Sequence, residues 1–93
     1  MQSLKEIVKK PETVIVDVRS PWEFDMEHVP GAKNIPLEEV MYKIKELKEI
    51  KTPIVLYCRS GNRSGMAVSI LKQNGITEVY NGGGLGDMQF LLN

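Results

Sequence analysis

Two short segments of this chain are continuously apolar and rich in β-branched residues, and they constrain its fold more than any other feature. One covers residues 13–18, which stay apolar until Asp17, and the other covers residues 54–57. A strand that is apolar at successive positions is covered on both faces, as in a parallel sheet. The two segments therefore predict buried, parallel strands.

Helix signals lie before, between and after these strands. Ser3 and Glu6 form a capping-box pattern, and Ser20 followed by Pro21 is typical of a helix start. Apolar residues at helical spacing predict further helices from residue 37 until Pro53, from about residue 63 to 73, and over residues 85–92. This spacing places Met41 and Met66 in the core. Residues 78–80 are expected to form a third main strand, and residues 81–84 a loop.

The alternation of strands and helices predicts an α/β fold, with a small, mostly parallel sheet and helices on both faces. A length of 93 residues corresponds to one domain, spanning residues 1–93. No apolar run is long enough to span a bilayer, and no signal peptide is apparent. We expect a monomer in the cytoplasm, or in the periplasm if a leader has been removed.

The charged residues and the single cysteine exclude several classes of function. The chain has 12 basic and 12 acidic residues, a balance that argues against nucleic acid or an anionic membrane as the main partner. With one cysteine and one histidine, it has no intramolecular disulfide and no Cys-rich or His-rich metal site. We expect neither a metal nor a cofactor.

Ligands of open α/β sheets bind beyond the carboxyl ends of the strands, and three segments of the chain meet that description. They are residues 17–19, 58–63 and 81–84. The middle segment places Cys58, two arginines and a glycine between a strand and a helix. Amides of such a loop point into its centre, and they favour a thiolate over a thiol. The helix dipole would add to this effect, as would Arg59 and Arg63 if they turned inward.

Two interpretations of Cys58 are open at this point. Free cysteines are among the residues most often buried, so Cys58 could be a small core residue at a strand end. The two arginines beside it favour a reactive cysteine, whose pKa lies below the free value of about 8.5 and whose loop holds an anionic substrate.

His28 lies in a turn, where a local hydrogen bond is favoured over a role in a serine-hydrolase triad.

Several motifs occur in a fixed order along the chain. They are Asp17-Val18-Arg19, Glu23-Phe24, His28-Val29-Pro30-Gly31-Ala32, Asn34-Ile35-Pro36 and Tyr57-Cys58-Arg59-Ser60-Gly61-Asn62-Arg63-Ser64. From about residue 14 to residue 87, the series resembles the rhodanese family of sulfurtransferases. With the ending Asn81-Gly82-Gly83-Gly84-Leu85, it is most similar to the small, single-domain, phage-shock type.

The resemblance implies a single rhodanese-like domain with a five-stranded sheet and a ping-pong transfer of sulfur. Cys58 would take the outer sulfur of thiosulfate or of another sulfane-sulfur donor and carry it as a persulfide. Cyanide, a thiol or a sulfur-accepting protein would then remove it. The implied catalytic residue is Cys58. The implied substrate-binding residues are Arg59, Ser60, Gly61, Asn62 and Arg63, and the supporting pair is Asp17 and Arg19.

Three alternative functions compete with sulfur transfer from thiosulfate, and two of them are disfavoured. A persulfide carrier that delivers sulfur to a biosynthetic partner protein would use the same residues but would react poorly with thiosulfate. A phosphatase or arsenate reductase is disfavoured, because related phosphatases need a longer loop that ends in arginine, and Ser64 occupies that position here. An inert regulatory domain is disfavoured because the nucleophile and the whole loop are present.

Overall fold

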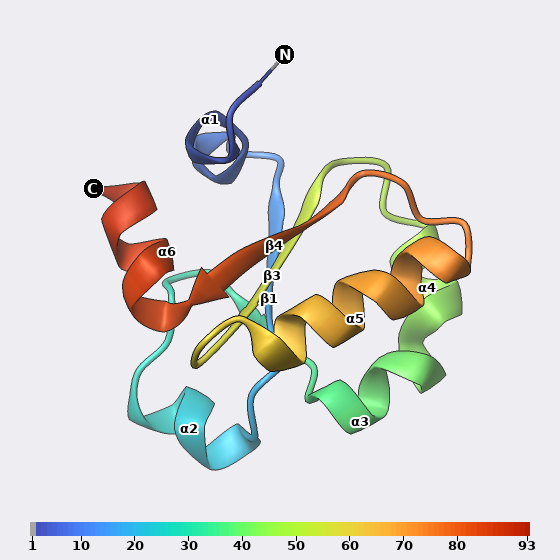
Figure 1. Cartoon of the computed structure of the whole chain (residues 1–93), viewed down its shortest axis with the longest axis horizontal. Helices are drawn as coiled ribbons and strands as arrows, with labels where there is room; N and C mark the ends of the chain where they lie inside the picture. Colours follow the sequence, from blue (N-terminus) through green and yellow to red (C-terminus); the bar gives the residue numbers. More distant parts are fainter. Residues whose placement is uncertain (1) are drawn as a thin grey trace.

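The computed structural model describes residues 2–93 and shows a parallel sheet of four strands in the order β2-β1-β3-β4 (Figure 1). The strands are β1 (Val14–Asp17), β2 (Lys33–Asn34), β3 (Ile54–Cys58) and β4 (Val79–Gly84). The α/β class and the parallel pairing are confirmed. The five-stranded sheet is wrong for the described residues, because every remaining segment of them is helical, turn or irregular and none extends beside β2 or β4.

Helices cover both faces of the sheet, as expected. On one face lie α1 (Leu4–Lys9) and α6 (Leu85–Leu92) (Figure 1). On the other lie α3 (Leu37–Val40), α4 (Ile44–Lys48) and α5 (Asn62–Gln73), with the 3₁₀ turn η1 (Met41–Lys43) joining α3 to α4. The remaining helix, α2 (Pro21–Met26), follows the carboxyl end of β1 and buries none of its residues.

The central strand β3 explains why the core has two halves. All of its residues are buried, and alternate side chains point to opposite faces. Ile54, Leu56 and Cys58 belong to the apolar cluster beneath α5, whereas Val55 and Tyr57 belong to the cluster beneath α1 and α6. The nucleophile candidate therefore lies at the carboxyl end of the most protected strand, on the side of α5.

Strand β4 is longer than the sequence predicts, because residues 81–84 continue the strand instead of forming a loop. Backbone pairing with β3 needs no side chains, so a glycine-rich segment can sustain it. Leu56 pairs with Asn81 and Tyr57 with Gly83, which leaves Gly82 as the extra residue of a bulge. At Gly84, a side chain would collide with the carbonyl oxygen of Arg59. The glycine thus lets β4 pass directly beneath the loop that follows Cys58.

Two residues predicted to lie in the core are on the surface. Met41 is 58% exposed and Met66 is 54% exposed. Met41 lies in η1, and a 3₁₀ turn has about three residues per turn, so it breaks the helical phase on which the prediction depended. Met66 lies beside the buried Ala67 on α5, just outside the stripe that faces the sheet.

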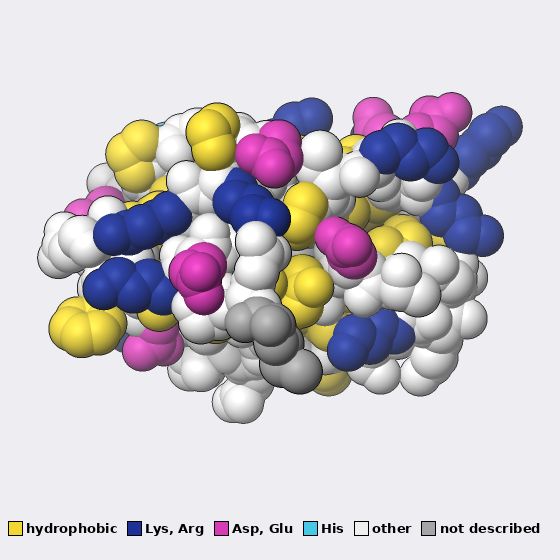
Figure 2. Space-filling view, turned by 90° about the horizontal axis from the view of Figure 1, so that it is seen from above, with side chains coloured by type: hydrophobic (Ala, Val, Ile, Leu, Met, Phe, Trp, Pro, Cys, Tyr) yellow, Lys and Arg dark blue, Asp and Glu magenta, His cyan; other side chains and the backbone are white. Residues whose placement is uncertain are grey.

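The surface carries acidic and basic side chains side by side. Figure 2 shows this mixture on one face, where blue and magenta groups alternate without a large area of either charge. No helix within residues 2–93 is long and apolar enough to cross a bilayer.

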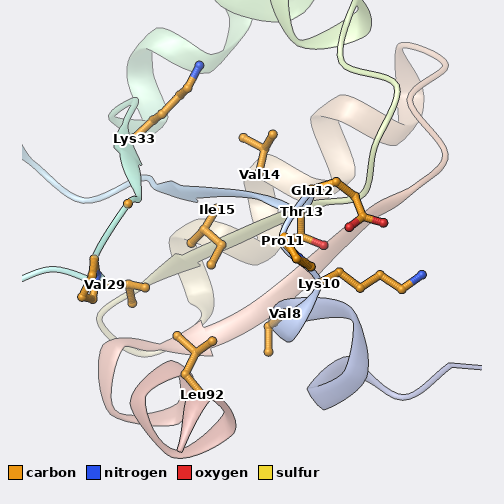
Figure 3. A pocket seen from close by; sticks show the side chains of 12 residues that line it. Val8, Lys10, Pro11, Glu12, Thr13, Val14, Ile15, Val29, Lys33 and Leu92 are labelled. Atoms are coloured by element: carbon orange, nitrogen blue, oxygen red, sulfur yellow. The ribbon is translucent and has the colours of Figure 1, made fainter.

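A cavity of about 560 Å³ lies at the start of β1, and we call it the amino-end cavity (Figure 3). Apolar side chains from α1, β1 and α6 form much of its wall, including Val8, Ile15 and Leu92. Lys10, Glu12 and Lys33 also line it. None of residues 58–63 lines this cavity, so it is separate from the cysteine loop.

Candidate active site

Cys58 is the last residue of β3, and the loop after it folds back over its sulfur. The N–H of Gly61 donates a hydrogen bond to Cys58 Sγ at 3.0 Å, and the N–H of Ser64 does so at 3.4 Å. Gly61 has a φ of +97°, in the left-handed region that favours glycine, and it is the residue just before α5. The loop therefore provides the inward-facing amides that the sequence predicts.

Burial and hydrogen bonding act on Cys58 in opposite directions. Cys58 is 0% exposed, and its burial raises the pKa of the thiol. Hydrogen bonds from the Ser64 hydroxyl and from the amides of Ser64, Ser60 and Gly61 outweigh burial, and the pKa lies below its usual value. Cys58 is thus buried, as a core cysteine would be, and bonded by donors, as a reactive one would be. The direction of the pKa shift is the one that the loop predicts.

Ser64 and Asn81 extend this hydrogen-bond network, and sequence reasoning assigned a role to neither. Ser64 Oγ lies 3.4 Å from Cys58 Sγ and 2.7 Å from Asn81 Oδ1, so the single hydroxyl proton can bond to either acceptor, and a thiolate at Cys58 competes for it. Asn81 Oδ1 also accepts from the N–H of Gly83 at 2.9 Å, and Asn81 Nδ2 donates to the carbonyl of Gly61 at 3.1 Å. Asn81 could have been found as a polar side chain in a strand beside β3. It ties β4 to the cysteine loop.

Arg63 faces a carboxylate instead of serving as a free positive charge at the sulfur. Its two terminal nitrogens donate to Glu23 Oε1 at 2.9 Å and to Glu23 Oε2 at 3.2 Å. The Arg63 hydrogen bonds lower the pKa of Glu23 to about 2, against the effect of burial. Glu23 also accepts from the backbone N–H and the hydroxyl of Ser20 at the start of α2. This pair therefore joins α2 to α5, which sequence reasoning missed because the partners are 40 residues apart.

The other loop residues are more open to solvent. Arg59, Ser60 and Asn62 are exposed, and within residues 2–93 Arg59 makes no salt bridge. Neither arginine is a leading cause of the lowered pKa of Cys58, although both had been considered for that role. Backbone amides and the Ser64 hydroxyl provide most of this stabilisation, while the bond to Glu23 and attraction to the Cys58 thiolate both raise the pKa of Arg63.

Asp17 and Arg19 form a buried ion pair at the carboxyl end of β1. Arg19 Nη2 donates to Asp17 Oδ2 at 2.7 Å and to the carbonyl of Glu27 at 2.6 Å, and Arg19 Nε contacts both carboxylate oxygens at 3.0 Å. Asn34 Nδ2 donates to the backbone carbonyls of Asp17 and Arg19, each at 3.0 Å. The pair holds the end of β1, α2 and β2 together. No hydrogen bond joins it to Cys58 within residues 2–93.

His28 makes the local contacts expected of a turn residue. Its Nδ1 donates to the carbonyl of Phe24 at 2.7 Å, and its ring stacks on the Phe24 ring with the centroids 3.7 Å apart. This confirms a local hydrogen bond for His28. Its position supports no serine-hydrolase triad.

A buried thiol with a lowered pKa and several donors around its sulfur is suited to nucleophilic attack followed by storage of negative charge. The same donors can stabilise a persulfide, since its sulfur atoms also accept hydrogen bonds. Cys58 Sγ lies at the base of the site, the amides of the loop surround it, and exposed side chains form the rim.

Known proteins are similar to this chain in both sequence and fold. A family model described as a rhodanese-like domain matches residues 1–85. The thiosulfate sulfurtransferase PspE of Escherichia coli is 46% identical over 74 residues, which cover 78% of this chain and 71% of PspE. The putative sulfur carrier protein YrkF of Bacillus subtilis is 38% identical over 82 residues, which cover 87% of this chain and 44% of YrkF.

The fold comparison leads to the same family. A structure described as rhodanese with anions from Escherichia coli has a TM-score of 0.74 and 42% identity, and the match covers 81% of this chain and 89% of that one. The chain spans about half the length of some curated relatives, including 44% of YrkF. By its sequence match and its fold, the chain belongs to the rhodanese-like family of sulfurtransferases.

Proposed function

We propose that the protein is a thiosulfate sulfurtransferase in which Cys58 carries the transferred sulfur as a persulfide. The observation that supports this most directly is the set of donors on Cys58 Sγ, from Gly61 and Ser64. These donors favour the thiolate, which is the nucleophilic form of cysteine. Similarity to PspE supports thiosulfate as the donor.

The first half of the reaction loads the enzyme. The Cys58 thiolate attacks the outer sulfur of thiosulfate, and a new bond forms between Sγ and that sulfur. The original sulfur–sulfur bond breaks, and its electron pair leaves with sulfite. One negative charge passes from Sγ to the outer sulfur of the persulfide, so charge balances without an added proton.

The loop residues have distinct roles in this proposal. The amides of Ser60, Gly61 and Asn62 surround the reacting sulfur, and Arg59 supplies the positive charge that attracts the thiosulfate dianion. Arg63 holds α5 against α2 through Glu23. Asp17 and Arg19 support the elements around the loop without touching substrate. Among the charged side chains named here, Arg59 alone is both exposed and outside a salt bridge.

A second function is favoured by the similarity to the putative sulfur carrier YrkF. In that case the same cysteine would accept sulfur from a protein persulfide and pass it to a biosynthetic partner. Turnover with thiosulfate, compared with turnover with a protein persulfide donor, distinguishes the two functions. A sulfurtransferase of the proposed kind reacts readily with thiosulfate, whereas a dedicated carrier does so poorly.

Intact-mass spectrometry after incubation with thiosulfate tests the proposal. We expect the mass to increase by one sulfur atom and to return to its starting value when cyanide is added. The chain has one cysteine, so the added sulfur can be assigned to Cys58. Cys58→Ser serves as the control and should gain no mass. A wild-type protein that gains no sulfur from thiosulfate would contradict the proposed donor.

A further inference from the structure

The side-chain amide of Asn81 links β4 to the cysteine loop, and its partners fix its orientation. The N–H of Gly83 can only donate, and it lies 2.9 Å from Asn81 Oδ1. The carbonyl of Gly61 can only accept, and it lies 3.1 Å from Asn81 Nδ2. A flipped amide would place two donors together at one contact and two acceptors together at the other. Asn81 therefore presents an oxygen, which is an acceptor, to the Ser64 hydroxyl.

The Ser64 hydroxyl has one proton and two acceptors within reach. Its Oγ lies 2.7 Å from Asn81 Oδ1 and 3.4 Å from Cys58 Sγ. Ser64 and Cys58 are both fully buried, so bulk water replaces neither partner. The shorter contact has the usual length of an O–H···O hydrogen bond, about 2.7–2.8 Å. The hydroxyl therefore donates to Asn81 in this geometry, and its lone pairs are left to face the sulfur.

The charge on Cys58 decides which acceptor the hydroxyl proton favours. A thiol can donate its own proton to Ser64 Oγ while the hydroxyl donates onward to Asn81, so all three groups are bonded. A thiolate has no proton to donate, and a charged acceptor makes a stronger hydrogen bond than a neutral amide oxygen does. The hydroxyl then turns from Asn81 to Sγ, and the N–H of Gly83 remains bonded to Asn81 Oδ1.

We infer that Asn81 is a positioning residue that holds the Ser64 proton while Sγ is uncharged, and that it thereby balances the two halves of sulfur transfer. The inference rests on the proposed function, in which the charge on Sγ is lost when the persulfide forms and returns when the persulfide is discharged. The hydroxyl faces Asn81 in the persulfide and Sγ in the thiolate. No hydrogen bond joins Asn81 to Cys58 within residues 2–93, so Asn81 acts through Ser64.

Competition for this proton makes the Cys58 thiolate less stable than it would be without the Asn81 oxygen. A less stable thiolate is a stronger nucleophile but a poorer leaving group. Asn81 therefore favours loading, in which Sγ attacks thiosulfate, over discharge, in which Sγ leaves. In discharge by cyanide, carbon attacks the outer sulfur, the sulfur–sulfur bond breaks, its electron pair returns to Sγ and thiocyanate departs. Charge balances in this step, because the hydroxyl only turns and gives up no proton.

Charged side chains around Cys58 come from β1, α2, the cysteine loop, α5 and α6. They are Asp17, Arg19, Glu23, Arg59, Arg63 and Asp87. Four of them form two salt bridges, and the Asp87 carboxylate accepts from the N–H of Gly84 at 2.7 Å. Within residues 2–93, none of the six bonds to the side chain of Ser64 or Asn81. A substitution at Asn81 leaves all six in place, so its effect on Cys58 reports on the Asn81–Ser64 contact.

The pH dependence of Cys58 alkylation by iodoacetamide tests the inference without sulfur transfer. Asn81→Leu keeps the approximate size of the side chain and removes the acceptor, which leaves the Ser64 proton to Sγ. We expect the alkylation midpoint to fall by about 0.5–1 pH unit, the effect of one neutral hydrogen bond. Asn81→Asp offers Ser64 a charged acceptor, so its midpoint should rise. An unchanged or raised midpoint in Asn81→Leu would mean that Asn81 only holds the loop in shape, and it would overturn the inference.

A double-variant cycle shows whether Asn81 acts through the hydroxyl. Ser64→Ala has no hydroxyl proton to hold, so adding Asn81→Leu to it should leave the midpoint of Ser64→Ala unchanged. An equal downward shift with and without the hydroxyl would contradict the role of Ser64.

Asn34→Leu is the matched control for the loss of a bridging amide. Asn34 Nδ2 also bonds to two backbone carbonyls, those of Asp17 and Arg19, but within the described residues it makes no hydrogen bond to Ser64. Asn34→Leu should lower stability in urea without lowering the alkylation midpoint, and urea denaturation also confirms that each variant is folded. A lowered midpoint in this control would contradict a specific role for Asn81.

Single-turnover rates of the two half-reactions test the balance itself, with intact mass as the readout. At a pH where Cys58 is fully ionised, Asn81→Leu should load sulfur from thiosulfate about twofold to threefold more slowly than wild type. Its loaded persulfide should discharge to cyanide faster by a similar factor. A variant that is slower in both steps would contradict the balance. If wild type gains no sulfur from thiosulfate, the proposed function fails, whereas the alkylation midpoints still report on Asn81.

Discussion

The two ends of the sheet offer cavities of the same size but of different chemistry. The amino-end cavity and a groove between α2 and the cysteine loop, lined by Trp22, Met26 and Arg59 among others, each have a volume of about 560 Å³. The first lies at the start of β1 and has Val8, Val14, Ile15 and Leu92 in its wall. The second lies at the carboxyl end, beside a loop whose amides point at a sulfur atom. Volume alone therefore does not distinguish a functional site.

The difference between the two ends follows from the direction of parallel strands. At the carboxyl end, each strand leads into a helix, directly for β4 and through a loop for the others, so backbone N–H groups are left to bind a ligand. Here Asp17 and Cys58 are the last residues of their strands and Asn81 lies within β4, and their hydrogen bonds connect the strands to the loops. The side-chain hydrogen bonds are concentrated where these donors meet, and under the proposed function substitutions should have unequal effects at the two ends.

The largest expected contrast concerns catalysis. Cys58→Ser should abolish formation of thiocyanate from thiosulfate and cyanide, since a hydroxyl cannot carry the sulfur at neutral pH. Lys33→Ala, in the wall of the amino-end cavity, should leave that rate unchanged. The colorimetric thiocyanate assay measures both. If Cys58→Ser retained wild-type turnover, the contrast between the two ends would disappear.

The next contrast concerns stability. Asp17→Asn removes one partner of a buried ion pair and leaves Arg19 without its carboxylate. Breaking such a pair costs about 3–5 kcal/mol of folding free energy. Lys33→Ala, at an exposed position, should change it by no more than about 0.5 kcal/mol. Urea denaturation measures both values, and equal stabilities would show that the pair does not support the site.

A smaller effect is expected on the reactivity of the Cys58 thiolate. Ser64→Ala removes the hydroxyl that approaches Cys58 Sγ and leaves the backbone N–H of residue 64 in place. Since a hydrogen bond to a charged group is worth about 1.5–3 kcal/mol, alkylation by iodoacetamide at neutral pH should slow by roughly tenfold. Ser64→Thr keeps a hydroxyl and should restore much of the rate. If Ser64→Ala reacted as fast as wild type, Ser64 would have no part in stabilising the thiolate.

The smallest effect is the pH dependence of the Glu23–Arg63 pair. The folded pKa of Glu23 is about 2, below the unfolded value of about 4.3, so its contribution is present above the unfolded pKa and is lost as pH falls towards 2. Because Arg63 is partly exposed, this contribution should not exceed about 1 kcal/mol. Urea denaturation at several pH values should show Glu23→Gln less stable than wild type at pH 7, with a difference that shrinks as pH falls and disappears below pH 2. A constant difference across this range would contradict the assignment.

The apolar pattern predicted the strands well because burial on both faces leaves a local signature. Residues 54–57 are all apolar, and each of them is buried in β3. The capping box at Ser3 and the helix start at Ser20 were also visible, because capping depends on residues close in sequence. The position of Cys58 at a strand end, before a helix, followed from these local signals.

Long-range contacts were not predictable in the same way. Arg63 pairs with Glu23 from another helix, and Asn81 reaches the cysteine loop from β4. Each contact depends on which strands become neighbours, and a single sequence does not reveal this. The strand character of residues 81–84 was missed because glycine has low intrinsic β propensity, and pairing with β3 overrides that propensity.

The hydrogen bonds of the loop lower the pKa of the Cys58 thiol, and one titration tests this central claim most directly. The rate of alkylation by iodoacetamide is measured as a function of pH, with and without thiosulfate. The hydrogen bonds on Sγ predict a midpoint below about 8.5, the value of a free thiol, and protection by thiosulfate. A midpoint at or above that value would mean that burial dominates at Cys58, and it would contradict the account.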